Sequence, residues 1–175
     1  TQFALRRTDL RLDGTATLHT EGDFALGGEL RWEAMPPGYA PLQAETWLSG
    51  SLRRLHLDQV VAAPYAVQAS VLLNAPLAEL QLEAAVELQA TDLVAINSDW
   101  PDMRLAGTMA ATGPPAALRL NGSVELRDAT AAALQLLFDG TLQPASLQLD
   151  TLQLSSPGRP SRLDAHGVIG LGAQP

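Results

Sequence analysis

The chain has 175 residues, of which 46% are hydrophobic and 17% charged, so it is long and apolar enough to bury a core and is not typical of a disordered protein. Its formal net charge is −8 and all 11 basic residues are Arg, which argues against a nucleic-acid partner, because phosphate binding needs a basic surface. The absence of Cys excludes disulfides and Cys-based metal sites.

We expect one domain over residues 1–175. No apolar run approaches the roughly 18 residues that a membrane helix needs. Because the sequence begins without Met and already within a patterned segment, we expect it to be a fragment of a longer protein, with any signal or membrane anchor outside it.

The first clear element is residues 10–18, which residues 118–126 nearly repeat in the form LRL[DN]G[TS]xxL. Asp-Gly and Asn-Gly normally indicate a two-residue hairpin, but a hairpin at 13–14 would mix polar and apolar residues on each face. A continuous strand keeps its apolar residues on one side. We therefore expect two continuous strands whose interior glycines lie on the apolar face and permit a bend or close approach.

Looser versions of this glycine-containing strand recur at 48–52, 105–109, 138–142 and 166–167. Their spacing varies, so they predict a recurring strand and not a solenoid of fixed period.

Interruptions of the alternation predict the turns. Segments rich in Pro and Gly at 35–41, 113–115 and 155–160 predict longer loops. Segments 52–55 and 147–154 each keep Leu residues on one face across two polar residues, which predicts tight hairpins, with a bulge as the alternative at 52–55.

The longest alternating run is 79–91, which we interpret as a strand because a helix would leave Leu82 and Val86 on its polar side. Directly after it, Asp92 is placed to cap a short helical turn over 93–96. Segment 129–137 fits either a helix or a strand.

The pattern as a whole predicts an all-β protein of roughly ten to twelve strands. Such a sheet must close into a barrel, pack on a second sheet or curl over its own apolar face.

No residue pattern indicates catalysis or metal binding. His19, His56 and His166 lie far apart within strand patterns, and none has an acidic or nucleophilic partner at a recognised spacing. The acidic residues alternate with apolar ones and so project to the solvent face, where they do not converge as paired carboxylates. We expect no enzymatic activity, no catalytic residues, no metal and no cofactor.

Three passages resemble the TamB/AsmA-like family of bridge-like lipid-transfer proteins: 47–57, then 90–96 running on to 104–109, and 114–126. In family terms they are similar to a "GxLxxLxL" strand pair, a short "DL" segment before a Gly-rich strand, and a "PxLxLxGxxxL" strand. The likeness rests on the order of these motifs across most of 42–142.

The resemblance implies a β-taco, which is an elongated, curled antiparallel or mixed sheet with a hydrophobic inner groove and at most one or two short helices. It also implies a periplasmic location, in a protein anchored to the inner membrane by a segment absent here. Two roles are implied: conducting phospholipid between the inner and outer bacterial membranes, and helping a TamA-type barrel, contacted through regions outside this fragment, to assemble outer-membrane proteins such as autotransporters.

The leading hypothesis is a passive conduit in which phospholipid acyl chains slide along an apolar wall, because aliphatic side chains bind by area without selecting a headgroup. The predicted groove residues are Leu10, Leu12, Leu18, Leu30, Trp32, Leu80, Leu82, Val86, Leu88, Leu105, Met109, Leu118, Leu120, Val124, Leu126, Phe138 and Leu142.

Two alternatives stay open. One is a chaperone-like groove or sheet edge that takes up strands of outer-membrane proteins by β-augmentation. The other is a closed β-sandwich with a structural role, because sandwich strands alternate in the same way.

Overall fold

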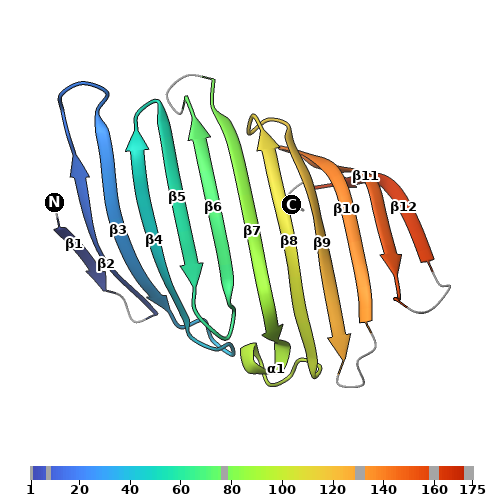
Figure 1. Cartoon of the computed structure of the whole chain (residues 1–175). Helices are drawn as coiled ribbons and strands as arrows, with labels where there is room; N and C mark the ends of the chain where they lie inside the picture. Colours follow the sequence, from blue (N-terminus) through green and yellow to red (C-terminus); the bar gives the residue numbers. More distant parts are fainter. Residues whose placement is uncertain (1, 7–8, 76–78, 129–132, 158–161, 172–175) are drawn as a thin grey trace.

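A computed structural model describes residues 2–6, 9–75, 79–128, 133–157 and 162–171, which form one antiparallel sheet of twelve strands and a single helical turn (Figure 1). Each strand pairs with the next one along the chain. The elements are β1 (Gln2–Arg6), β2 (Leu10–Leu18), β3 (Ala25–Ala34), β4 (Leu42–Ser51), β5 (Arg54–Val61), β6 (Val67–Asn74), β7 (Gln81–Asp92), α1 (Leu93–Ile96), β8 (Met103–Gly113), β9 (Leu118–Asp128), β10 (Ala133–Gln143), β11 (Ser146–Ser155) and β12 (Arg162–Gly170).

The strand register brings the apolar residues of successive strands onto one face. Residues directly opposite each other in an antiparallel ladder project from the same side of the sheet. One row of such partners crosses the sheet from β2 to β12 and consists of Leu12, Trp32, Ala44, Val61, Val67, Leu88, Gly107, Val124, Leu136, Leu154 and Leu163. We call the side that carries this row the apolar face, and the opposite side the polar face.

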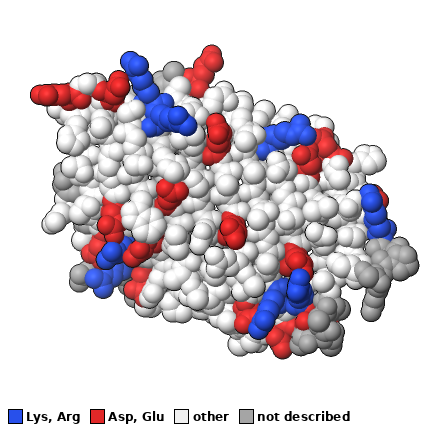
Figure 2. All heavy atoms as spheres, viewed as in Figure 1, with Lys and Arg blue, Asp and Glu red and all other residues white. Residues whose placement is uncertain are grey.

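The sheet curls towards its apolar face. In Figure 1 the C-terminal strands turn away behind the plane of the middle strands. Figure 2, viewed from the same side, shows Asp, Glu and Arg side chains across the surface that faces the reader, which is therefore the polar face. The right-handed twist of β-strands produces such curvature in a sheet of many strands.

The described residues form no second layer over the sheet. Among the described residues, only Ala44, Thr91, Ala111 and Gly140 are buried. The molecule exposes 11442 Å², whereas a compact monomer of 18.5 kDa exposes about 8,200 Å². The all-β curled sheet predicted from the sequence is confirmed, with purely antiparallel pairing, and the single open sheet is not the closed β-sandwich alternative.

The two repeated segments form β2 and β9 as continuous strands, as predicted. Gly122 in β9 also has the predicted close approach. A Cβ atom there would lie 2.6 Å from Cζ of Phe138 and 2.4 Å from the carbonyl oxygen of Thr108. Phe138 therefore lies over a position that only glycine can occupy without displacing it.

Most predicted turns are found. Segment 35–41 connects β3 to β4, and Gly113 ends β8 before the turn at 114–117. The hairpin at 52–55 exists, but its two-residue loop is Leu52-Arg53, one residue earlier than the pattern suggested, because Gly50 pairs with Leu55.

The predicted hairpin within 147–154 is wrong. Residues Ser146–Ser155 form one strand, β11, with a bulge between Leu149 and Leu152. The extra residue in the bulge restores the phase of the alternation, so both leucines stay on the apolar face without a turn.

The remaining local predictions have mixed outcomes. The helical turn α1 follows Asp92, but the Asp92 side chain makes no cap hydrogen bond and instead accepts one from Nε of Arg104 at 2.7 Å. Residues 133–137 belong to β10, while 129–132 and 158–160 lie outside the described residues. No helix in the described ranges is long and apolar enough to cross a membrane.

Candidate functional site

The predicted groove residues are brought together on the apolar face. All of them except Leu80 lie within strands, and Leu80 directly precedes β7. Their register is consistent: Leu12 lies opposite Trp32, and Val86 lies opposite Met109. The structure therefore places these residues on one surface, although their role in binding lipid stays a prediction.

The middle of this surface was not among the predicted groove residues. Those residues pass from β3 directly to the start of β7, whereas β4, β5 and β6 lie between them in the sheet. These strands contribute further apolar-face residues, including Leu48, Leu57 and Val71. Their signal was the same alternation, visible in Leu55-His-Leu57 and in the run from Val67 to Leu73.

The C-terminal strands extend the surface further. Leu147, Leu149, Leu152 and Leu154 of β11 all belong to the apolar face. They were not among the predicted groove residues, although the expected hairpin also placed all four leucines on one face.

The apolar face is half-buried by its own neighbours and exposed at its ends. Leu18 is 54% exposed, Leu163 63% and Ile169 49%. Monomeric proteins rarely expose a continuous apolar surface of this extent unless it binds something. The chemistry available to the face is non-directional binding of hydrocarbon, because no charged side chain interrupts its strand interiors among the described residues.

Two polar residues interrupt the face at its middle. Thr46 of β4 lies directly opposite Gln59 of β5, and both are half-buried. The residues that precede and follow them on this face are apolar.

Hydrogen bonds tie three loops together at the end of the sheet where α1 lies (Figure 1). The Ala40 amide donates to the carbonyl of Ile96 at 2.8 Å, and the Tyr65 hydroxyl donates to the carbonyl of Ala40 at 2.8 Å. The hydroxyl of Thr91, which is 2% exposed, donates to the carbonyl of Tyr65 at 2.7 Å. These contacts fix the relative positions of the strand ends along one side of the apolar face.

Comparison with protein-family models found no match for this sequence, and comparisons with curated proteins and solved structures found none either. The functional conclusion therefore depends on the two faces of the sheet themselves.

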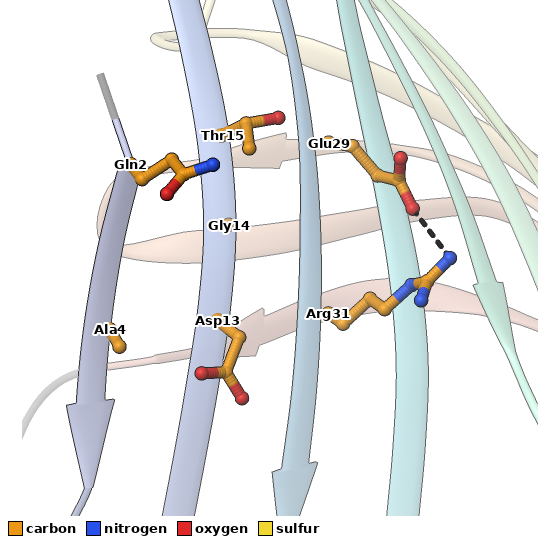
Figure 3. Close-up of a pocket in the computed structure, with 7 residues that line it drawn as sticks. All are labelled: Gln2, Ala4, Asp13, Gly14, Thr15, Glu29 and Arg31. Carbon is orange, nitrogen blue, oxygen red and sulfur yellow. Dashed lines mark ion pairs between the residues drawn. The ribbon is translucent and has the colours of Figure 1, made fainter.

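The polar face carries shallow, charged hollows. Figure 3 shows one of about 550 Å³, lined by residues of β1, β2 and β3, in which Arg31 pairs with Glu29 at 2.8 Å. Arg31 also lies 3.2 Å from Glu45 on β4. These side chains are largely exposed, so each pair contributes little stability.

Exposed charged pairs also occur at the C-terminal end of the polar face. Hydrogen bonds from Arg162 and then Gln153 lower the pKa of the Asp164 carboxyl. Because these groups lie in water on an edge strand, they are typical of a solvated surface and not of a binding site.

His56 has partners that the sequence analysis missed. Its Nε2 lies 2.9 Å from the Ser70 hydroxyl, and its Nδ1 lies 3.3 Å from Oδ2 of Asp58. Asp58 is two residues further along β5, and Ser70 comes from the neighbouring β6, so only the strand register reveals the trio. Its order resembles a Ser-His-Asp triad.

A hydrolase site also needs an enclosed pocket and donors that stabilise an oxyanion, and the described surroundings of the trio offer neither. The side chains of His56 and Asp58 are 43% and 49% exposed on an open surface. Both β5 and β6 are paired on each side, so their backbone N–H groups serve the ladders and do not point at a substrate. Of the other histidines, His19 directly follows β2 and His166 lies in β12.

Proposed function

We propose that the apolar face is the wall of a groove along which phospholipid acyl chains pass between the inner and outer bacterial membranes. The observation that carries this proposal is the unbroken row of apolar partners from β2 to β12, over which the part of the chain that the structure describes forms no second layer. A protein that needed these residues only for its core would cover them.

The energetics suit a conduit. Burying a CH₂ group fully is worth about 0.8 kcal/mol, so a chain lying half-buried on an open wall gains several kcal/mol in total. That gain holds a chain on the wall, and it changes little when the chain slides by one carbon because most side chains of the wall are aliphatic. The headgroup stays in water and is not selected.

The cellular setting of the proposal comes from the resemblance to the TamB/AsmA-like family. It supplies a periplasmic location, an inner-membrane anchor outside this chain and a TamA-type outer-membrane barrel as a partner for other regions of the protein. The acidic net charge of −8 is consistent with a role that needs no nucleic acid.

Two neighbouring positions in β9 test the proposal. Leu120 lies on the apolar face opposite Ala111, whereas Arg119 lies on the polar face and donates to Asp139 at 2.8 Å. A photo-crosslinking residue at Leu120 of the full-length protein is expected to capture phospholipid, and the same residue at Arg119 is not. Equal yields of lipid adducts at the two positions would contradict the assignment of the wall.

A second candidate function concerns β12, which pairs with β11 and with no other strand among the described residues. Every residue of β12 is exposed, and Val168 reaches 70%. The edge of a sheet can take up a strand of another protein by β-augmentation. A crosslinker at Val168 that captured outer-membrane proteins, together with no lipid adduct at Leu120, would favour this assembly role.

A further inference from the structure

Among the described residues, Thr46 and Gln59 are the one pair of polar residues that lie directly opposite each other on the apolar face. Thr46 lies opposite Leu30 on one side and Gln59 on the other, and Gln59 in turn lies opposite Ala69. Thr46 lies in the middle of β4, and Gln59 lies within β5 with Leu57 before it and Val61 after it on the same face. The pair therefore lies within the wall of the proposed groove and not at its rim.

A slip in strand register does not explain the pair. On either side of it the apolar residues keep their phase, with Leu48 opposite Leu57 and Ala44 opposite Val61. The next residue in each strand is apolar and points the other way: Trp47 is 36% exposed and Val60 40% exposed on the polar face. Burial of apolar area alone would favour the opposite arrangement.

The two side chains have unused hydrogen-bonding capacity. A Gln amide offers two N–H donors and one acceptor, and a Thr hydroxyl offers one donor. Within the ranges that the structure describes, neither the Thr46 hydroxyl nor the Gln59 amide makes a hydrogen bond, and neither is fully buried. A ligand lying on the wall can reach both.

The donors are neutral, which limits the ligand group that they suit. Phosphate and carboxylate groups are usually bound by Arg or Lys. The charged neighbours of this pair, Glu45 and Asp58, are acidic and point to the polar face. A neutral acceptor such as an ester carbonyl fits donors of this kind.

We propose that Thr46 and Gln59 bind the carbonyl group of an acyl ester, so that the wall prefers ester-linked lipids to ether-linked lipids of the same chain length. This inference rests on the proposed function, because it requires the acyl chain to lie on the apolar face. The ester oxygen accepts hydrogen bonds at the pair, and the chain extends over the neighbouring leucines and valines. The headgroup stays in water on the side of the groove away from the sheet.

The test compares a diacyl phosphatidylcholine with its dialkyl analogue, which has the same chains and headgroup but no carbonyl. We expect the purified chain to bind the diacyl lipid about three- to tenfold more tightly, the usual worth of one net hydrogen bond. The double variant Thr46→Val/Gln59→Leu is expected to bind both lipids equally and to retain the affinity for the dialkyl lipid. Gln68→Leu, on the polar face of β6, is the matched control and is expected to preserve the preference.

The outcomes separate the two proposals. Binding of both lipids with equal affinity by the unaltered chain, or a preference that survives in the double variant, overturns the ester site and leaves the lipid groove intact. Absence of binding to either lipid overturns the groove and the ester site together. The comparison in the unaltered chain needs no variant, so it decides the matter even if the double variant fails to fold.

Discussion

At the scale of single residues, the sequence indicated the glycine positions but not their partners. The repeat LRL[DN]G[TS]xxL placed Gly122 inside a strand on the apolar face, which the structure confirms. It could not indicate that Phe138 is the residue that lies over this glycine, because that contact depends on the pairing of β9 with β10.

Gly122→Ala is expected to lower the free energy of unfolding by about 1–3 kcal/mol, because the added methyl group meets both the Phe138 ring and the carbonyl oxygen of Thr108. Urea unfolding followed by circular dichroism measures the loss. Gly167→Ala is the matched control, since nothing lies within 4 Å of the Cβ position there and its stability is expected to change little. Equal losses at both glycines would show that close packing is not the reason for Gly122.

Ser70 is expected to be unreactive despite its contact with His56. Acyl transfer needs donors that stabilise an oxyanion, and the paired strands β5 and β6 offer no free backbone N–H group. A fluorophosphonate probe should therefore label Ser70 no faster than Ser49, which lies opposite His56 on β4. Labelling of Ser70 that His56→Gln abolishes would contradict this expectation and establish a reactive serine.

At the scale of elements, alternation predicted strands well and turns less well. A two-residue hairpin and a one-residue bulge both keep Leu149 and Leu152 on one face, so the pattern alone does not distinguish them. The composition of the segment could have decided between the hairpin and the bulge. Asp150-Thr151 contains neither the Gly nor the Asn that tight hairpins prefer. The Leu52-Arg53 loop also contains neither residue, but Gly50, two residues before the loop, adopts a φ of 128°.

Deletion of Asp150 provides a direct test of the bulge. In a bulged strand the deletion restores regular pairing, with Thr151 opposite His166 and both leucines still on the apolar face. We therefore expect the melting temperature to fall only slightly, by an amount equivalent to about 1 kcal/mol or less. Deletion of Gln153 is the control, because it shifts Leu154 to the polar face and is expected to destabilise β11 strongly. If the two deletions are equally damaging, the bulge is misplaced.

At the scale of the whole molecule, the sequence determined which face is apolar but not whether protein covers it. Strands of a sandwich and strands of an open curled sheet alternate alike, so the choice depends on long-range pairing that no local pattern encodes. The consecutive order of the strands settles it here, because a meander of twelve strands leaves no segment to form a second layer among the described residues. The wall residues of β4, β5 and β6 show the same alternation in the sequence, and the strand register places them on the apolar face.

The openness of the apolar face leads to the last prediction, which concerns a charge placed within it. Leu82 lies between Leu73 and Gly113 on this face. In the full-length protein, Leu82→Arg is expected to leave folding largely intact, because its guanidinium can reach the water on the open side. An acyl chain passing that point must displace this water, which costs several kcal/mol for an unpaired charge. The variant should therefore increase the sensitivity of cells to detergents and large antibiotics that an intact outer membrane excludes. Gln81→Arg, the neighbouring residue on the polar face, adds the same charge and is expected to have no such effect. A folded Leu82→Arg protein in cells with normal resistance would contradict a lipid path along this face.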